Sequence, residues 1–187
     1  PQFQNKNSDC FFLQRSDKYQ TVETVLELCC ERLPSAYNLN PVTDIQLLCP
    51  SRMLDTGTVN FNNLLQERLN PRKMGEPQLS FKGIYLRVND KVMQIKNNYD
   101  LQYVKDNGEY GTGIFNGDVG FITDIDIRGG IVKVRYDDKV ATYFSFFFSQ
   151  LELAYAVTVH KSQGSEYPCV IIPLSDVPTK LMYRNLL

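Results

Sequence analysis

The stretch 154–173, AYAVTVHKSQGSEYPCVIIP, decides how the fold of this chain is interpreted. Its first half predicts a helix that ends at Gly164, because glycine supplies a left-handed helix end at no steric cost. Residues 165–168 then predict a polar turn, and the apolar run 169–172 predicts a buried strand. A helix, a turn and a strand in this order are typical of a layered α/β domain.

Polar residues crowd the last two turns of this predicted helix: Thr158, His160, Lys161, Ser162 and Gln163. Residues three or four apart share a helix face, so lysine and hydroxyl groups would lie side by side. Such donors can hold a phosphate, and a histidine and a glutamine offer directional hydrogen bonds. A solvated helix end would show the same composition, because cations there complement the helix dipole. The residues by themselves leave both interpretations open.

Strands and helices alternate through the rest of the sequence outside its middle third. Short apolar runs at 10–14 and 44–49 predict strands, as 169–172 does. Helical spacing of apolar residues predicts helices over 22–33 and 61–69, each ended by a proline that follows. This order predicts a parallel sheet flanked by helices.

The middle of the chain has a different pattern. The runs VMQI, GDVGFITDI, IVKVRY and VATYFSF are short, alternating or aromatic, and turn residues separate them. These are hairpin signals, and about five short strands without crossovers should close on themselves as a small barrel. We expect this all-β insertion at 82–148, with the polar segment 97–112 as a mobile loop at its rim.

Composition and charge limit the possible functions. Of the 187 residues, 43% are hydrophobic and 22% are charged, and 20 basic against 21 acidic residues give a net charge of -1. This balance provides no general attraction to phosphate backbones, so any nucleic-acid contact must be local.

The cysteines predict a reducing cytosol. They are odd in number and lie in apolar runs, as small core residues do: Cys10, Cys29, Cys30, Cys49 and Cys169. One histidine and no C-x-x-C pair predict no structural metal. The apolar runs are shorter than the ~20 residues of a membrane span, so we expect a soluble protein without membrane contact.

Three stretches resemble the second RecA-like domain of RecD-like superfamily 1 DNA helicases, the exodeoxyribonuclease V alpha-subunit type. VTVHKSQGSEYP with its following strand resembles motif V, and DIQLLCPSRMLDTGTVNFNNLLQERLNP resembles the strand, loop and helix that open the domain. KVMQIKNNYD followed by FNGDVGFI resembles an inserted SH3-like barrel. The resemblance implies a discontinuous RecA-like domain, 1–81 and 149–187, interrupted by the barrel at 82–148.

The resemblance also implies roles for the motif V residues. Thr158 and His160 would face single-stranded DNA, with Lys161 and Ser162 as further DNA contacts. The turn at Gln163 and Gly164 would lie between the DNA and the nucleotide. Glu166 would accept a hydrogen bond from the ATP ribose, a role that suits an acceptor-only carboxylate.

The loop and helix after the 44–49 strand add three candidates. Arg52 follows a parallel strand at the edge where such sheets bind ligands, and it is a candidate for ATP binding; pairing with Asp55 is the alternative. Thr58 and Asn60 begin the next helix, whose N-terminus can receive a DNA phosphate. A purely capping role for Thr58 is the alternative.

Two departures from the family pattern bear on function. Asn89 stands where the turn before KVMQ usually has glycine. Asparagine is compatible with this position, because it also adopts the left-handed backbone conformation. MYRNLL, at 182–187, resembles the lead-in to motif VI, and no G-x-x-x-x-G-K-[ST] loop occurs. We therefore expect a piece of a longer polypeptide that is inactive alone.

In that polypeptide the first RecA-like domain would bind most of the ATP and Mg²⁺, and the whole would move on single-stranded DNA, 5′ to 3′ by analogy. Subunits of a recombination or repair complex are further possible partners, and the bacterial cytosol is the expected location. A conjugative relaxase or viral enzyme with the same motor, and a non-catalytic module that binds nucleic acid or protein, are the alternatives. A catalytic use of His160 with a cysteine nucleophile lacks a positioned third group.

Overall fold

Strand β1 (Ile45–Cys49) is the centre of a three-stranded parallel sheet in the computed structural model, which describes residues 10–175. It pairs with β11 (Ala156–Thr158) on one side and with β12 (Cys169–Ile171) on the other. All five residues of β1 are buried, because neighbouring strands and packed helices cover it. The predicted strands at 44–49 and 169–172 are confirmed, and β11 is a strand that the sequence did not predict.

Three helical segments follow one another before β1: α1 (Lys18–Glu27), the π-helical turn η1 (Leu28–Arg32) and α2 (Leu33–Tyr37). The helix was expected to stop at Pro34, and it continues for another turn. In the π-turn the hydrogen bond shifts by one residue, with the Leu33 N–H donating to the Leu28 carbonyl. Pro34 then lies at the start of α2, where its missing N–H costs nothing.

The predicted strand at 10–14 is wrong. Residues 10–15 have no regular secondary structure, and the side chains of Phe11, Phe12 and Leu13 are exposed. A strand requires a partner edge for its backbone hydrogen bonds, and an apolar run alone does not supply one. The stretch 182–187, which resembles the lead-in to motif VI, lies outside the described residues.

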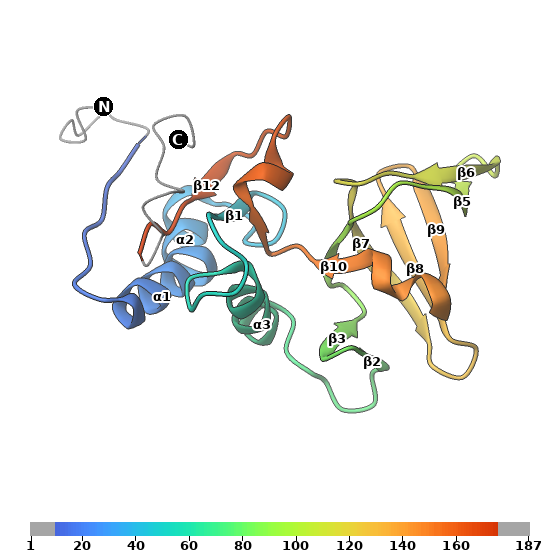
Figure 1. Cartoon of the computed structure of the whole chain (residues 1–187), viewed down its shortest axis with the longest axis horizontal. Helices are drawn as coiled ribbons and strands as arrows, with labels where there is room; N and C mark the ends of the chain where they lie inside the picture. Colours follow the sequence, from blue (N-terminus) through green and yellow to red (C-terminus); the bar gives the residue numbers. More distant parts are fainter. Residues whose placement is uncertain (1–9, 176–187) are drawn as a thin grey trace.

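Helix α3 (Thr58–Leu69) confirms the prediction for 61–69 and ends at Asn70, before Pro71. Phe61 and Leu65 are fully buried from one face of this helix, which packs against α1 and β11. The three α-helices lie together on one side of the parallel sheet (Figure 1).

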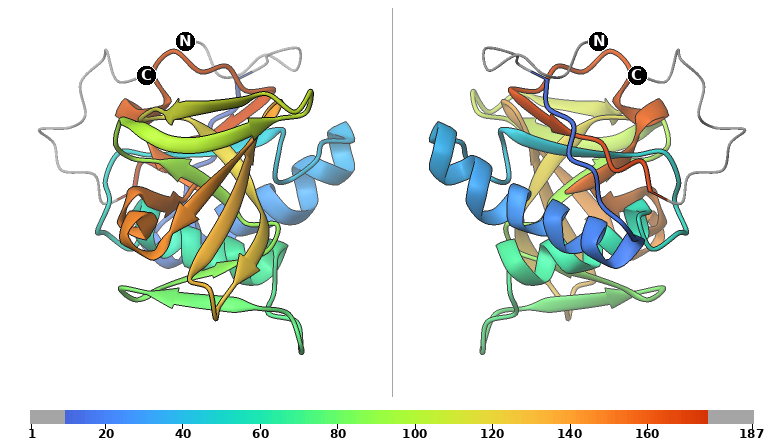
Figure 2. Two further views of the ribbon diagram at one scale, coloured as in Figure 1. Left: turned by 90° about the vertical axis from the view of Figure 1, so that its right-hand side faces the viewer. Right: turned by 90° about the vertical axis from the view of Figure 1, so that its left-hand side faces the viewer.

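The second part of the chain is antiparallel. A hairpin of β2 (Gln78–Phe81) and β3 (Ile84–Arg87) comes first. A seven-stranded sheet follows, in the order β10-β4-β7-β8-β9-β5-β6. Its members are β4 (Lys91–Gln94), β5 (Asn98–Lys105), β6 (Tyr110–Ile114), β7 (Val119–Asp126), β8 (Ile131–Tyr136), β9 (Lys139–Phe144) and β10 (Leu151–Leu153), with the 3-10 turn η2 (Ser145–Gln150) before β10. Figure 2 shows the β5–β6 ribbon lying across the strands β8 and β9.

The segment 97–112 was expected to be a loop, and most of it forms β5 and β6. Strand β5 pairs with β6 on one side and with β9 on the other. Its polar residues obscured the strand pattern, because one face is solvated and a register shift between Asn98 and Gln102 interrupts the alternation. The seven-stranded sheet therefore holds two more strands than the five predicted, counting β10 beyond residue 148.

Buried polar residues join the two sheets. The Lys91 amine, at the start of β4, donates to the Val42 carbonyl (2.8 Å) and to Oε1 of Gln46 on β1 (3.0 Å). The Gln46 side chain in turn donates to the carbonyls of Ala154 (3.2 Å) and Tyr155 (3.1 Å), between β10 and β11. The chain crosses between the two sheets just before β4 and again after β10, and hydrogen bonds connect both crossings to β1.

Asp90, together with Lys91 and Gln46, forms a buried polar joint between the two sheets, and Asp90 itself is completely buried. Its carboxylate accepts hydrogen bonds from Gln66 (2.6 Å) and Asn70 (2.8 Å) of the α3 region and from the Tyr155 hydroxyl (3.0 Å). Burial raises the pKa of Asp90, and these hydrogen bonds oppose that rise. The preceding Asn89 has φ 72°, as predicted for the turn, and this brings Asp90 inward.

The Lys91 amine predicts an unusual pH dependence of stability. Burial lowers the pKa of Lys91 to about 8, although the charge of Asp44 opposes this. An unfolded lysine has a pKa of about 10.4, so between the two values the unfolded chain binds more protons and stability rises with pH. We therefore compare the wild type with a Lys91→Met variant. The difference in their free energies of unfolding, wild type minus variant, should rise by about 1 kcal/mol from about pH 7 to pH 9.

Urea denaturation of both proteins across this pH range measures the difference. Burial also raises the pKa of Cys29 and of Cys49, which would lower stability above the ordinary thiol pKa, but both variants share these groups. A difference between the two proteins that does not change with pH would show that Lys91 is not held in this buried position.

Candidate functional site

The candidate site lies where two neighbouring parallel strands end. Cys49 of β1 is in register with Thr158 of β11, so the chain leaves both strands at the same edge of the sheet. From β1 it continues into the loop 50–57, and from β11 into the 3-10 turn η3 (Val159–Ser162). The carboxyl edge of a parallel sheet is where α/β proteins place their ligands.

A small pocket opens at this edge, with a volume of about 30 Å³. A pocket of this size has room for water, since one water molecule needs about 10–15 Å³ of such space. Polar residues from the β1 loop, α3, β10, β11 and η3 line it: Arg52, Thr58, Asn62, Glu152, Thr158 and Lys161. Four of the predicted site residues therefore meet here, although they come from stretches about 100 residues apart.

Glu152 on β10 holds the two cations of this pocket. Its Oε1 lies 2.7 Å from Nη2 of Arg52, and its Oε2 lies 3.0 Å from Nζ of Lys161. Partial burial acts to raise the pKa of Glu152, but the hydrogen bonds from Lys161 and Arg52 outweigh it and the pKa is lowered. Partly exposed ion pairs of this kind contribute about 0–1 kcal/mol each to stability, so they can be broken at little cost.

The predicted pairing of Arg52 with Asp55 does not occur. Asp55 forms its ion pair with Lys18 at 2.5 Å, across the loop from Arg52. Thr58 is also not a helix cap: Gly57 has that position, and Thr58 is the first helical residue, with a buried side chain that lines the pocket.

The helix predicted over 154–164 is wrong, and the physical cause is the neighbouring side chain of Asn62. Asn62 is buried in α3; its amide donates to the Ala156 carbonyl (2.9 Å) and its carbonyl oxygen accepts from the Ala156 N–H (2.8 Å). With Gln46 bonded to the preceding two carbonyls, the segment is extended as β11 and only 159–162 turns. Gly164 keeps the positive φ that was predicted, 85°, after this short turn.

The remaining DNA candidates are placed in different environments. His160 is exposed on η3. Ser162 is buried, and its hydroxyl donates to the Val159 carbonyl at 2.8 Å within the turn. The side chain of Asn60 donates to the Asp55 carbonyl at 2.7 Å and so closes the loop before α3.

The ATP candidates other than Arg52 lie on the turn that follows η3. Gln163, Gly164 and Glu166 are all exposed there, outside the residues that line the pocket. The predicted residues therefore form two groups: a pocket group at the sheet edge, and an exposed turn that begins next to it.

Sequence reasoning missed two members of the site, Glu152 and Asn62. Glu152 lies between two buried leucines in β10, so the alternation of that strand could have shown it facing away from the core. Asn62 directly follows Phe61 on the buried face of α3, and a polar residue on an apolar helix face was the available signal.

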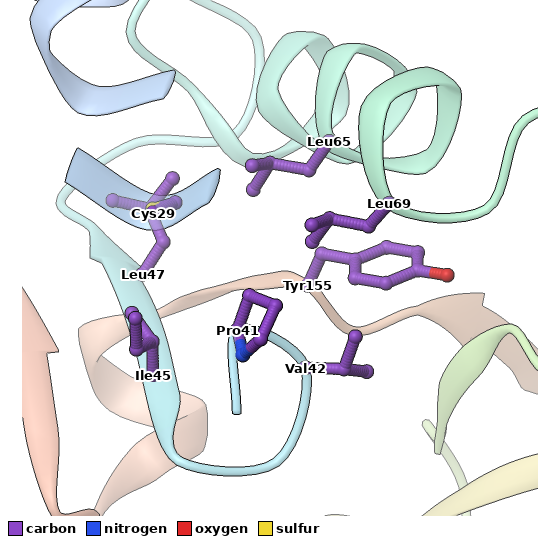
Figure 3. A pocket seen from close by; sticks show the side chains of 8 residues that line it. All are labelled: Cys29, Pro41, Val42, Ile45, Leu47, Leu65, Leu69 and Tyr155. Carbon is purple, nitrogen blue, oxygen red and sulfur yellow. The ribbon is translucent and has the colours of Figure 1, made fainter. Parts of the chain in front are cut away.

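Another small cavity lies deeper, between the helices and β1 (Figure 3). Mostly apolar side chains surround it, including Cys29, Leu47, Leu65 and Tyr155, and its volume of about 10 Å³ marks a gap in core packing. Among residues 10–175 no three His, Cys, Asp or Glu side chains are grouped as metal ligands. In the same part of the chain, no helix is long and apolar enough to cross a membrane.

Comparison with known proteins gives the family. Residues 61–136 match the family model described as the ATP-dependent RecD-like DNA helicase SH3 domain, and residues 153–187 match that of the UvrD-like helicase C-terminal domain. The chain belongs to the C-terminal region of RecD-like superfamily 1 helicases. The first match runs from α3 to the end of β8, and the second begins at the last residue of β10.

Relatives of this RecD-like region are much longer proteins. The ATP-dependent RecD2 DNA helicase of Deinococcus radiodurans is 32% identical over 142 residues, which are 76% of this chain and 18% of that protein. An uncharacterized protein of Methanocaldococcus jannaschii is 30% identical over 118 residues, covering 54% of this chain and 9% of that protein. The RecD-like region thus spans less than a fifth of these relatives.

Solved structures with weaker likeness include two of Bacteroides Pif1. The unliganded form is 20% identical, with a TM-score of 0.36, and covers 70% of this chain and 46% of that one. The form bound to single-stranded DNA is 17% identical, with a TM-score of 0.39. The match covers 87% of this chain and 44% of that one.

Asn62 should be essential for the position of β11, and an Asn62→Ala variant tests this. The substitution leaves the buried N–H and C=O of Ala156 without their partners, so we expect a loss of about 2–4 kcal/mol in the free energy of unfolding. Asn63→Ala is the matched control, since Asn63 is the next residue of α3 and is exposed. Equal urea midpoints for the two variants would contradict the role given to Asn62.

Proposed function

We propose that this RecD-like region is the second motor domain of an ATP-dependent DNA helicase that moves on single-stranded DNA. The observation that carries the proposal is the meeting of Arg52, Thr58, Thr158 and Lys161 at the carboxyl edge of the parallel sheet. The similarity to a protein named as an ATP-dependent DNA helicase supports it. Movement from 5′ to 3′ and a role in recombination or repair are parts of the same proposal.

The DNA contact is local. With a net charge of -1, the chain has no general attraction to a phosphate backbone, and affinity for it must come from grouped donors. The pocket supplies a guanidinium, an amine and two hydroxyls, beside the N-terminus of the 12-residue helix α3. Such contacts position a strand without reading its bases. His160, exposed on η3, extends this surface outward.

The nucleotide contact is assigned to the exposed turn. Glu166 has the chemistry to accept hydrogen bonds from ribose hydroxyls, with Gln163 and Gly164 beside it and Arg52 at the same edge. The first RecA-like domain of the same polypeptide would hold most of the ATP and the Mg²⁺. ATP bound there supplies the free energy for movement.

Coupling between the two contacts follows from their closeness in the chain. Thr158, His160 and Glu166 lie within nine residues, in a strand end, a short turn and an exposed loop. A shift of the turn when nucleotide binds would change the groups that hold DNA. This is a two-state element that both ligands bias, which is what physical coupling requires.

The proposal divides the chain into a RecA-like domain, 1–81 and 149–187, and an SH3-like domain, 82–148. The match of 61–136 to an SH3 family model supports the second, and the antiparallel sheet from β4 to β10 occupies nearly the same stretch. Cys29, Cys30, Cys49 and Cys169 are free thiols, which supports a reducing cytosol as the location.

A non-catalytic module that binds nucleic acid or protein is the second candidate function. The exposed aromatic residues on the antiparallel part favour it, among them Tyr110 and Phe146, because aromatic faces bind bases or apolar partners. A G-x-x-x-x-G-K-[ST] loop upstream in the full reading frame would decide for the motor.

A Glu166→Ala variant of the full-length protein tests the nucleotide contact. We expect weaker ATP binding, with KM for ATP raised about 3- to 30-fold and an unchanged melting temperature, because Glu166 is exposed. Glu27→Ala, at an exposed acid of α1, is the control. If the ATPase kinetics of Glu166→Ala match those of the control, Glu166 is not a nucleotide contact.

A His160→Ala variant tests the DNA contact separately. Loss of the imidazole should reduce the stimulation of ATPase by single-stranded DNA about 3- to 10-fold, while the ATPase without DNA stays the same. The measurement is the ATPase rate against the concentration of an unstructured oligonucleotide. Normal stimulation would remove His160 from the DNA surface.

A further inference from the structure

We propose that the carboxylate of Glu152 mimics a DNA phosphate. Between Arg52 and Lys161 it occupies the position that a phosphodiester of single-stranded DNA takes when bound. Glu152 would thereby set the affinity of this site. The inference rests on the proposed function, since it names the ligand chemistry and the control of the same site.

The geometry of the carboxylate matches that of a phosphodiester. Each of its two oxygens faces a different cation, Oε1 toward Arg52 at 2.7 Å and Oε2 toward Lys161 at 3.0 Å. A phosphodiester also presents two anionic oxygens from one centre, so it can take the same two partners. Arginine and lysine are the usual donors to such oxygens.

The site is built by separate parts of the fold. Arg52 comes from the loop after β1, Lys161 from η3, and Glu152 from β10 of the antiparallel sheet. Thr58, 8% exposed, lines the same pocket from the first turn of α3. Convergence of cations and a hydroxyl from three elements of the parallel part distinguishes this pocket from a chance surface ion pair.

The ion pairs require displacement of the carboxylate. The two oxygens of Glu152 already occupy Nη2 of Arg52 and Nζ of Lys161, the donors that a phosphodiester would need. The side chain of Glu152 is 22% exposed, so a path outward to solvent exists. An incoming phosphate therefore exchanges with Glu152 and does not bind beside it.

The charges of the cluster allow a phosphate both to bind and to leave. Two cations and one carboxylate leave the cluster with one net positive charge, and the lowered pKa of Glu152 keeps the carboxylate ionised at neutral pH. An arriving phosphate must break both ion pairs, which weakens binding and allows release. Release of each phosphate is what a protein that moves along a strand requires.

Replacement of Glu152 by glutamine tests the exchange. In the full-length protein without nucleotide, fluorescence anisotropy with a labelled oligo(dT) should show about 3- to 10-fold tighter binding for Glu152→Gln than for wild type. The salt dependence of the binding constant should also steepen by about 0.7 in logarithmic slope, because loss of the carboxylate raises the net positive charge that the site brings to the phosphate by one. A purely structural role of Glu152 would not change that slope.

Two further variants complete the experiment. Glu109→Gln, at an exposed acid paired with Lys105 in the antiparallel part, is the matched control and should bind oligo(dT) as wild type does. Arg52→Gln added to Glu152→Gln should abolish the gain in affinity. Melting temperatures of all variants check folding, and Arg52→Gln alone, at a half-exposed residue, should weaken binding even if Glu152→Gln does not fold.

The outcomes separate this inference from the proposed function. If oligo(dT) binding requires His160 but Glu152→Gln and Arg52→Gln leave it unchanged, the motor proposal stands and the exchange is wrong. If Glu152→Gln tightens binding of ATP and not of oligo(dT), the phosphate is that of the nucleotide, and the assignment to DNA is overturned. If no variant binds oligo(dT), both proposals fail.

Discussion

The buried polar joint at Asp90, Lys91 and Gln46 is the interaction on which the rest of the structure depends. These three side chains connect the first strand of the antiparallel sheet to β1, to α3 and to the segment before β11. A buried carboxylate and a buried amine are costly to desolvate, and they are tolerated here because nearby donors and acceptors surround both. The joint therefore specifies one arrangement of the two sheets, since any other would leave these groups unpaired.

The candidate site is a consequence of that arrangement. Glu152 belongs to the antiparallel sheet, whereas its partners Arg52 and Lys161 belong to the parallel part, so the ion pairs form only when the two sheets are held as they are. The antiparallel sheet thus contributes a charged residue to the edge of the parallel sheet. In the proposed motor, it takes part in the control of DNA affinity through this one carboxylate.

Most of the architecture could be predicted from local patterns. The strand 45–49, the helix 58–69 and the strand at 169–171 have apolar runs or helical spacing that match their structures. Errors came where partners distant in sequence decide the outcome. Residues 10–14 lack a neighbouring edge. Residues 156–158 became a strand because they pair with β1, and Asn62 and Gln46, about 100 residues away, hydrogen-bond the backbone of 154–156.

The sequence by itself determined the family, the separation into parallel and antiparallel parts, and the identity of four residues at the candidate site. The spacing of apolar residues, the turn residues and the spacing of motifs are local properties, and they can be recognised along the chain. Only the tertiary structure decided that Arg52, Thr58, Thr158 and Lys161 share one pocket and that Glu152 neutralises part of its charge. Electrostatic interactions depend on distance in space, and the fold alone brings residues 52, 152 and 161 within hydrogen-bonding distance.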